Sequence, residues 1–160
     1  MSVTYKICYG EIPLKIHIKD GYKITKVEFI KHCDTKNSEV LEEFLKLVKG
    51  LPGKFSIDLS DTDEKSLKVF KATLTIPYGK VTTYGEISKK AFGNINFSRF
   101  VGYALSRNPL PVIIPCHRVV DRSFRLRGFT GGLLLKEHLL ISEGVKIKDG
   151  KVDRRFFVNL

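Results

Sequence analysis

The stretch NPLPVIIPCHRVV, residues 108–120, places a cysteine beside a histidine at the end of an apolar run. A free thiol is mostly protonated at neutral pH, so a nucleophilic cysteine needs a base or a positive environment. If the chain turns here, His117 could take the proton of Cys116 directly or through one water molecule. Glu143 or Asn108 could then orient the imidazole. The alternative is that Cys116 is a small buried side chain and His117 an ordinary turn residue.

The residues around the cysteine favour the functional interpretation. Prolines at positions 109, 111 and 115 restrict the backbone before it, and the sequence HRVV resumes an extended run after it. A thiol in such a stiff loop is better placed for chemistry than one inside a core helix.

The elements before this loop predict a small sheet with one helix. Residues 4–9, 14–19 and 24–30 alternate apolar and polar side chains and are separated by turn residues, which indicates an antiparallel meander. From Ser38, apolar residues recur at helical spacing as far as Gly50, a typical helix C-cap. Pro, Gly, Asp, Ser and Thr then cluster over residues 50–63. We therefore expect one domain over residues 1–62 and a second over residues 63–160.

The second part reads as mainly helical. Asp61 with Glu64, and Thr83 with Glu86, resemble capping pairs at helix starts, and Ser98 could cap a helix that ends near residue 108. The pair of helices around Gly93 has the pattern of a helix-turn-helix, although a plain helical hairpin would explain the same residues.

The end of the chain predicts two further elements. Residues 131–144 form an amphipathic pattern, and the Asp149-Gly150 pair indicates a small hairpin or a packed tail.

Charge narrows the class of partner. Among 160 residues, Lys and Arg outnumber Asp and Glu by 28 to 17, which gives a formal net charge of +11. Most of this excess lies in the C-terminal half and favours a nucleic acid or an anionic membrane as partner; a solubilising surface is the plainer explanation. No run is long and apolar enough for a membrane span, and no signal sequence opens the chain, so we expect a cytoplasmic protein. Three cysteines without close pairing fit a reducing compartment and leave at least one free thiol.

The cysteine loop carries a family resemblance. The sequence IPCHRVV, preceded by NPLPV and followed by GFTGGLLLKEHLLISEG, resembles the O6-alkylguanine-DNA alkyltransferases, also called methylated-DNA–protein-cysteine methyltransferases. The resemblance runs from about residue 67 to residue 144, and the first domain is similar to that family only in outline, as a sheet-plus-helix domain of RNase H-like type.

The resemblance implies a suicide repair protein. Cys116 would take the alkyl group from O6 of guanine, possibly also from O4 of thymine, in duplex DNA and keep it as a thioether. His117 would be the water-mediated base and Glu143 its orienting acid, while Asn108 would brace the active-site turn. Lys136 is retained from the helix motif, with a role that stays open.

The same resemblance implies how DNA is handled. Tyr84 would lie beside the extruded nucleotide and donate from its phenol to the base. Arg99 would fill the gap in the stack after the base has rotated out of the duplex. The pocket would include Pro111, Val119, Phe129, Thr130 and Gly131, with main-chain groups at Val119 and Cys116 accepting hydrogen bonds from the guanine amino group.

Several residues depart from the family pattern. Phe129 stands where tyrosine is usual, and Thr130 stands where serine is usual. Phe97 and Phe100 replace the small residues that usually surround the arginine, so either these rings face the core or DNA docks differently. Arg122, Arg125 and Arg127 lie in a loop that commonly contains glycine, where they could contact phosphates or be solvated.

A zinc site is the weakest of the alternatives. His17, His32, Cys8 and Cys33 are ligand types, and some relatives carry a structural zinc in this domain, but the adjacent His32 and Cys33 and the lack of a Cys-x-x-Cys pair argue against it. We therefore expect no metal and no cofactor.

These observations lead to one hypothesis for the whole chain. The fold class is α+β, with a small N-terminal antiparallel sheet plus helix and a mainly helical C-terminal domain. The protein would act as a monomer on duplex DNA containing O6-alkylguanine, with no membrane partner. Two other classes remain: a non-catalytic binder of alkylated DNA, against which Cys116 argues, and a cysteine hydrolase with multiple turnovers.

Overall fold

The alternating residues at the start of the chain form three long antiparallel strands. They are β1 (Ser2–Tyr9), β2 (Ile12–Lys19) and β3 (Lys23–Phe29). Ser2 pairs with Lys19 and Tyr9 with Ile12, and a register shift in β2 lies between His17 and Ile18. The short strand β4 (Ser56–Ile57) adds to β3 in parallel, so the sheet order is β1-β2-β3-β4. The predicted meander is confirmed.

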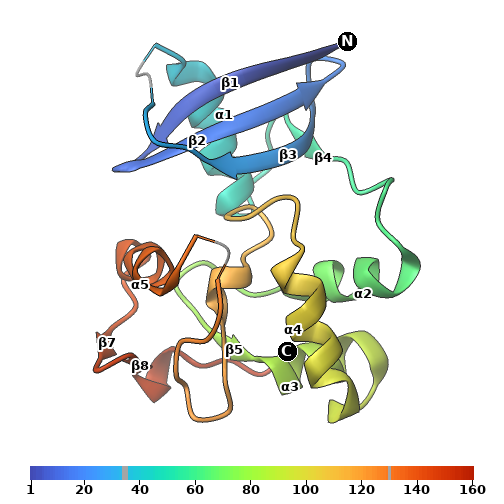
Figure 1. Cartoon of the computed structure of the whole chain (residues 1–160), viewed down its shortest axis with the longest axis vertical. Coiled ribbons are helices and arrows are strands. Elements are labelled where there is room, and N and C mark those ends of the chain that lie inside the picture. Colours follow the sequence, from blue (N-terminus) through green and yellow to red (C-terminus); the bar gives the residue numbers. More distant parts are fainter. Residues whose placement is uncertain (34–35, 130) are drawn as a thin grey trace. The chain divides into compact units, whose positions relative to one another are not determined.

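Helix α1 (Ser38–Val48) packs on this sheet (Figure 1). Its fully buried Phe44 meets the ring of Tyr9 edge-on, with 5.9 Å between the ring centroids. Burial of these aromatic and aliphatic side chains against one face of the sheet supplies the core of the N-terminal part.

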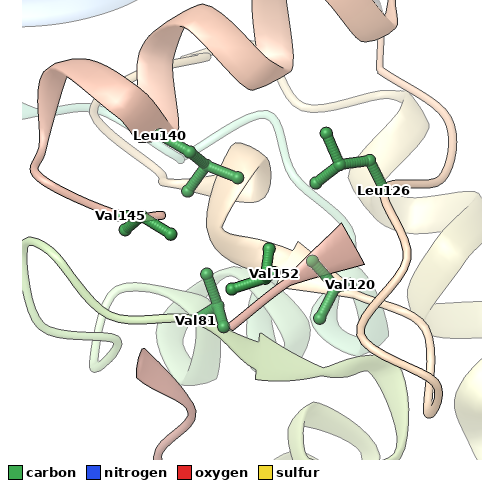
Figure 2. Close-up of a cluster of buried hydrophobic side chains, with 6 residues drawn as sticks. All are labelled: Val81, Val120, Leu126, Leu140, Val145 and Val152. Atoms are coloured by element: carbon green, nitrogen blue, oxygen red, sulfur yellow. The ribbon is translucent and has the colours of Figure 1, made fainter. Parts of the chain in front are cut away.

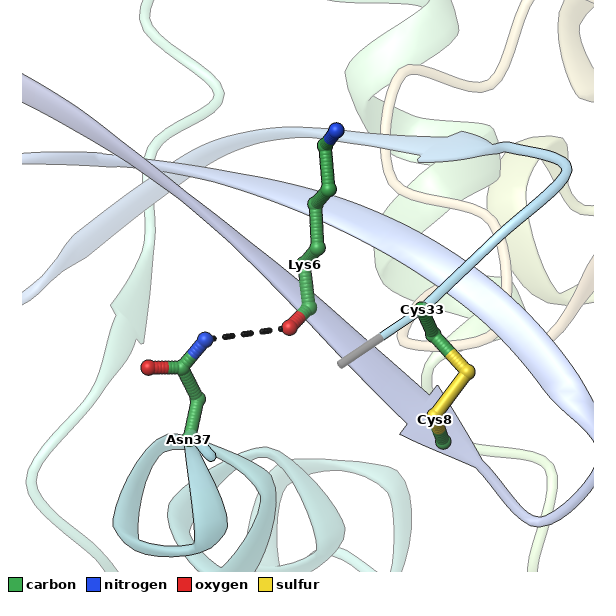
Figure 3. Close-up of a disulfide and its surroundings, with 4 residues drawn as sticks. All are labelled: Lys6, Cys8, Cys33 and Asn37. Carbon is green, nitrogen blue, oxygen red and sulfur yellow. Dashed lines mark hydrogen bonds between the residues drawn. A yellow bond between two sulfur atoms is a disulfide. The ribbon is translucent and has the colours of Figure 1, made fainter. Parts of the chain in front are cut away.

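The same part contains a disulfide that the sequence did not predict. Cys8, near the end of β1, is bonded to Cys33, and their Cα atoms lie 5.3 Å apart (Figure 3). Nearby, the side-chain amide of Asn37 donates to the carbonyl of Lys6 at 3.1 Å. The expected free thiol is Cys116, but the Cys8–Cys33 pair was not predicted, because it depends on where β1 meets the segment after β3 and not on sequence spacing. Cysteine usage therefore gives no support for a reducing compartment.

The structure describes residues 1–33, 36–129 and 131–160, which fall into two units. One unit contains residues 1–61 and 109–113, and the other contains residues 62–108 and 114–160. The short return to the first unit was not anticipated, since residues 109–113 had been assigned to the second domain. In that segment the carbonyl of Pro109 accepts from the amide of Val27 at 2.9 Å, and Leu110 is fully buried.

Three helices and a short 3-10 turn form one side of the second unit (Figure 1). They are α2 (Glu64–Thr73), α3 (Tyr84–Phe92), η1 (Ile95–Phe97) and α4 (Ser98–Ser106). Thr83 caps α3 by accepting from the amide of Glu86, as predicted. Gly93 then ends that helix with a φ of 85°, in the left-handed region that glycine adopts at little cost.

Two of the predicted caps were wrong. Asp63, and not Asp61, caps α2 by accepting from the amide of Ser66 at 2.8 Å. Ser98 is the first residue of α4, and its hydroxyl donates back to the carbonyl of Ile95 at 2.8 Å. Because η1 leads directly into α4, the chain is already helical where the cap was expected.

The remaining elements support the cysteine loop. They are β5 (Thr82–Thr83), η2 (Cys116–Arg118), β6 (Val119–Val120), α5 (Leu133–Ser142), β7 (Ile147–Lys148), β8 (Lys151–Val152) and η3 (Arg154–Phe156). The strands β7 and β8 form the hairpin predicted around Asp149-Gly150. Among the described residues, no helix is long and apolar enough to cross a membrane.

An apolar cluster joins these elements (Figure 2). It consists of the buried side chains of Val81, Val120, Leu126, Leu140, Val145 and Val152. Leu140 comes from α5, Val120 from β6 and Val152 from β8, so the cluster fixes α5 relative to the strand that follows the cysteine. This packing sets the positions of the polar side chains at the two ends of α5.

Candidate active site

Two short parallel strands bring the cysteine loop beside the start of α3. Thr82 pairs with Val119, and Thr83 pairs with Val120. Tyr84 follows β5 directly, and the 3-10 turn that begins with Cys116 leads directly into β6. Strand pairing therefore places these two functional candidates in one region, although they lie far apart in the sequence.

The sulfur of Cys116 is a buried free thiol held by an amide. The side chain of Cys116 is only 7% exposed. The Nδ2 group of Asn108 donates to its Sγ at 3.2 Å and to the carbonyl oxygen of Ile114 at 2.9 Å. Asn108 thus ties the end of α4 to both sides of the loop, as the resemblance implied.

His117 is fully buried and directed at Glu143. Its Nε2 lies 2.7 Å from Oε2 of Glu143, which is the C-cap residue of α5. The Nδ1 atom is buried and has no hydrogen-bond partner among the residues that the structure describes. The ring of Phe129 meets the imidazole edge-on at 6.5 Å. The sequence left the orienting group open between Glu143 and Asn108, and the structure puts Glu143 on the imidazole and Asn108 on the sulfur.

Arg118 completes the surroundings of Glu143. Its Nε and Nη2 donate to the two carboxylate oxygens at 2.8 and 3.0 Å, while Nη1 donates to the carbonyl of Ile76 at 3.0 Å. The amide of Gly79 donates to Oε1 of Glu143 at 2.9 Å. A bidentate guanidinium fixes the plane of a carboxylate. The carboxylate can therefore hold the imidazole in one orientation.

These contacts determine which nitrogen of His117 carries the proton. Burial alone would raise the pKa of Glu143, but hydrogen bonds and charges from His117 and Arg118 hold it at about 2. Burial lowers the pKa of His117, so its imidazole is neutral at pH 7. A carboxylate only accepts, so Nε2 of a neutral imidazole must be the donor. The proton is then absent from Nδ1, which is left as a base.

The thiol is protonated in this environment. Burial raises the pKa of Cys116, although the hydrogen bond from Asn108 and the charge of Lys136 act in the opposite direction. A buried thiol of this kind needs a base at the moment of reaction, because little thiolate is present beforehand.

Lys136 is a fully buried cation next to the site. Its Nζ donates to the carbonyl oxygens of Val119 at 2.7 Å and of Arg127 at 2.6 Å. Burial lowers its pKa to about 8, while the neighbouring Cys116 and Asp121 act against that shift. The ammonium group joins the strand after the cysteine to the loop that contains Arg127, Gly128 and Phe129, which we call the pocket loop.

A pocket of about 310 Å³ opens at the sulfur. Its lining consists of Tyr84, Gly102, Leu105, Ser106, Cys116, Gly128 and Phe129. This volume is at the lower end of the range for small-molecule sites. Burial raises the pKa of Tyr84 to about 12, so its phenol keeps its proton and can donate. A planar aromatic ligand could lie between aromatic walls with its substituent near Sγ.

Comparison with known proteins identifies the family. The model described as 6-O-methylguanine DNA methyltransferase, DNA binding domain, matches residues 64–145. The methylated-DNA–protein-cysteine methyltransferase of Methanosarcina acetivorans is 38% identical over 131 residues, which cover 81% of this chain and 78% of that protein. The chain belongs to the 6-O-methylguanine DNA methyltransferase family.

Two further relatives show how far the likeness extends. The methylated-DNA–protein-cysteine methyltransferase of Mycobacterium bovis is 45% identical over 84 residues, or 52% of this chain and 50% of that protein. The crystal structure of the Mycobacterium tuberculosis OGT protein in complex with DNA is 27% identical, with a TM-score of 0.68 over 89% of this chain and 91% of that one. The mixed α+β fold with a small sheet plus helices is therefore shared with methyltransferase structures.

The structure brings together much of the site expected for a methyltransferase of this family. Cys116, Tyr84 and Phe129 line the pocket, and His117, Glu143 and Asn108 contact one another or the sulfur as described. Arg99 is exposed in the first turn of α4 and is not among the lining residues of the pocket.

Other expected pocket residues lie elsewhere or are not described. Val119 is fully buried, and its carbonyl already accepts from Lys136. Gly131 is exposed and is not among the lining residues, and Pro111 belongs to the segment that packs with the first unit. Thr130 lies outside the described residues. The roles of these residues in the pocket stay predictions.

Sequence reasoning missed two parts of the site. Arg118 had no assigned role, although an arginine directly before the apolar pair Val119-Val120 could signal a buried ion pair. Gly102, Leu105 and Ser106 line the pocket from α4, and no local pattern distinguishes them from other residues of an amphipathic helix.

Proposed function

We propose that this protein repairs DNA by transferring a methyl or larger alkyl group from O6 of guanine to Cys116, once per molecule. The observation that carries the proposal is a buried free thiol at an open pocket, next in the chain to an imidazole whose Nδ1 has no hydrogen-bond partner within the described part of the chain. Family membership and the DNA-bound relative support the substrate class.

The chemical step follows from these groups. The thiol proton passes to Nδ1 of His117 through one water molecule, and the thiolate attacks the alkyl carbon. The S–C bond forms while the C–O bond breaks, and the electron pair of that bond stays on O6 of guanine. The guanine anion takes up one proton, equal to the one that left the thiol, and the restored guanine stays in the DNA strand. Tyr84 donates a hydrogen bond to the base as negative charge develops on it.

The chemistry also explains why each molecule would act once. The product at Cys116 is a thioether, which has no carbonyl group for water to attack. An acyl-enzyme would instead be hydrolysed to regenerate the thiol, as in cysteine hydrolases. The expected product is therefore an alkylated, spent protein.

DNA would bind through α3 and α4. We place them as a helix-turn-helix around Gly93, with α4 entering a groove of the duplex. The target nucleotide must leave the stack, because its alkyl carbon cannot reach a buried sulfur otherwise. Support comes from α4 itself, which exposes Arg99 at its start and lines the pocket with Gly102 and Ser106. Arg99 would occupy the gap left by the flipped base.

The finer structural assignments belong to the same proposal. The order of a meander, a helix and a parallel strand supports an RNase H-like type for the first domain, over residues 1–62. Residues 63–160 would form the DNA-binding and alkyl-acceptor domain, as the family match over residues 64–145 suggests. We further propose a monomer that acts in the cytoplasm without a metal or cofactor.

A count of repaired guanines tests the function. Excess duplex containing O6-methylguanine is incubated with the protein, and restored guanine is quantified by nucleoside chromatography. We expect a plateau at one restored guanine per protein molecule. Cys116→Ser should bind the duplex without repairing it, whereas the double variant Cys8→Ser, Cys33→Ser should repair as the wild type does. Repair by Cys116→Ser, or a plateau well above one, would contradict the proposal.

A further inference from the structure

Four aromatic rings lie together along α3, η1 and α4. Phe92 lies 4.7 Å from Phe97 and 6.1 Å from Phe100, and Phe100 lies 6.1 Å from Tyr103, measured between ring centroids. We call these four residues the aromatic row. Phe97 and Phe100 are half-buried, but Tyr103 is 56% exposed. The row therefore begins in packed structure and ends at the surface.

Cations lie over two rings of the aromatic row. The Nζ of Lys65, from α2, lies 4.1 Å from the ring centroid of Phe100, and Cζ of Arg107 lies 5.7 Å from that of Tyr103. No Asp or Glu occurs between residues 87 and 120. Aromatic rings interleaved with Lys and Arg, on a helix whose own stretch of chain has no acidic residue, are complementary to a nucleic acid, which offers flat bases on an anionic backbone.

The aromatic row also has a defined position relative to the pocket. Gly102 and Ser106 line the pocket from α4, and Tyr103 follows Gly102 directly. Tyr103 comes four residues after Arg99, so the two side chains are neighbours on one exposed face of the helix. A base that enters the pocket would leave its former neighbours in the strand close to this face.

We propose that Tyr103, supported by the ring of Phe100 beside it, forms a stacking surface for an unpaired nucleobase of DNA bound at α4. This inference rests on the proposed function, because it takes DNA to bind at α4. Nucleotide extrusion breaks the stacking of the bases next to the target, and an aromatic side chain can replace that contact for any base. Large aromatic rings at positions 100 and 103 are then part of the DNA-binding surface. The protein should also bind more tightly to DNA that is already locally unpaired.

Binding to undamaged DNA tests the stacking surface without any reaction. Two fluorescein-labelled oligonucleotides of equal length are used, one fully paired and one with a short central bubble of unpaired bases, and fluorescence anisotropy gives Kd. We expect Tyr103→Ala to weaken binding to the bubble about tenfold, as the loss of one base–aromatic stack predicts. Binding to the paired duplex should change much less.

Two control variants separate stacking from other causes. Tyr103→Phe keeps the ring and should bind the bubble as the wild type does. Tyr22→Ala removes a tyrosine that is 43% exposed in the other unit, beside Lys23, and should change neither Kd. The inference is overturned if Tyr103→Ala binds both oligonucleotides as the wild type does, weakens both equally, or is matched by Tyr22→Ala.

A separate measurement keeps this inference distinct from the proposed function. Free O6-benzylguanine needs no DNA contact to reach Cys116, and mass spectrometry reports its transfer. Transfer at the wild-type rate by Tyr103→Ala, together with lost bubble preference, supports the stacking surface. If the wild type transfers nothing from O6-benzylguanine or from alkylated DNA, the proposed function fails, whatever the anisotropy result.

Discussion

Glu143 receives hydrogen bonds from Arg118, Gly79 and His117, and this concentration of donors explains its effect on His117. Two come from Arg118, one from the amide of Gly79 and one from the imidazole. A charge in this buried position is stable only while these partners surround it. The carboxylate can therefore do two things at once: it fixes the imidazole tautomer and neutralises the buried guanidinium.

The fixed tautomer makes the first prediction. In Glu143→Gln, the amide group can donate to Nε2 of His117, which would move the ring proton to Nδ1 and remove the base. We expect alkyl transfer to slow about 100-fold or more, the usual contribution of a general base, with duplex binding retained. Single-turnover kinetics on an O6-methylguanine duplex measure the rate. Glu137→Gln, on the same helix, is the control, and equal rates for the wild type and Glu143→Gln would refute the assigned tautomer.

The low pKa of Glu143 predicts how stability depends on pH. Its folded pKa of about 2 lies below the ordinary value of 4.5, so ionised Glu143 stabilises the fold at pH values above that ordinary value. The contribution is lost as pH falls from about 4.5 towards 2. Thermal unfolding should show a steeper fall in Tm between about pH 5 and pH 3 for the wild type than for Glu143→Gln. Parallel slopes would mean that this carboxylate does not carry the effect.

Part of the site could be predicted from the sequence. The PCHRV motif locates the cysteine and its histidine, because they are adjacent in the chain. Glu143 lies 26 residues from His117, so spacing alone could not choose between it and Asn108. The structure settles this choice, because the packing of α5 against β6 and the hairpin brings the carboxylate of Glu143 to the imidazole.

Helix α5 positions two polar groups of the site. Lys136, in its first turn, binds the pocket loop, and Glu143, at its C-terminal end, contacts His117. Leu140, which lies between them in the chain, packs in the apolar cluster with the hairpin strands. Because one rigid helix carries both groups, it holds the imidazole of His117 and the pocket loop in fixed positions relative to the sulfur of Cys116.

The bonds of Lys136 give a prediction about the pocket loop. Lys136→Met keeps the length of the side chain but removes the ammonium group that binds the carbonyls of Val119 and Arg127. We expect transfer from free O6-benzylguanine to slow about tenfold, the equivalent of one charged hydrogen bond, and trypsin to cleave faster after Arg127. Lys146→Met, an exposed lysine, is the control. Unchanged transfer and cleavage in Lys136→Met would remove this role.

Element positions followed from the sequence more closely than element ends did. Alternating strands, amphipathic helices and the Thr83 cap came from local patterns that the structure retains. The cap of α2 moved by two residues from Asp61 to Asp63, because several neighbouring residues could serve as the cap. The Cys8–Cys33 disulfide depends on where β1 and the segment after β3 meet, which no local pattern states.

The positive charge of the molecule is unevenly distributed along the chain. The net charge of +11 is concentrated in the half of the chain that contains α3, α4 and the cysteine loop, which favours a polyanion as partner.

The chain leaves the second unit after Asn108 and returns to it at Ile114. The sequence suggested a single boundary, because the contact of Pro109 with Val27 joins residues too distant for any periodic pattern to link.

The central claim is that one sulfur, at Cys116, becomes permanently alkylated. Intact-mass spectrometry after incubation with excess O6-methylguanine duplex tests it most directly, followed by peptide mapping. We predict that the whole population gains the mass of one methylene group, since methyl replaces the thiol hydrogen, and that the gain lies in the peptide containing Cys116. Protein of unchanged mass after the DNA has been repaired, or a methyl group on another residue, would contradict the account.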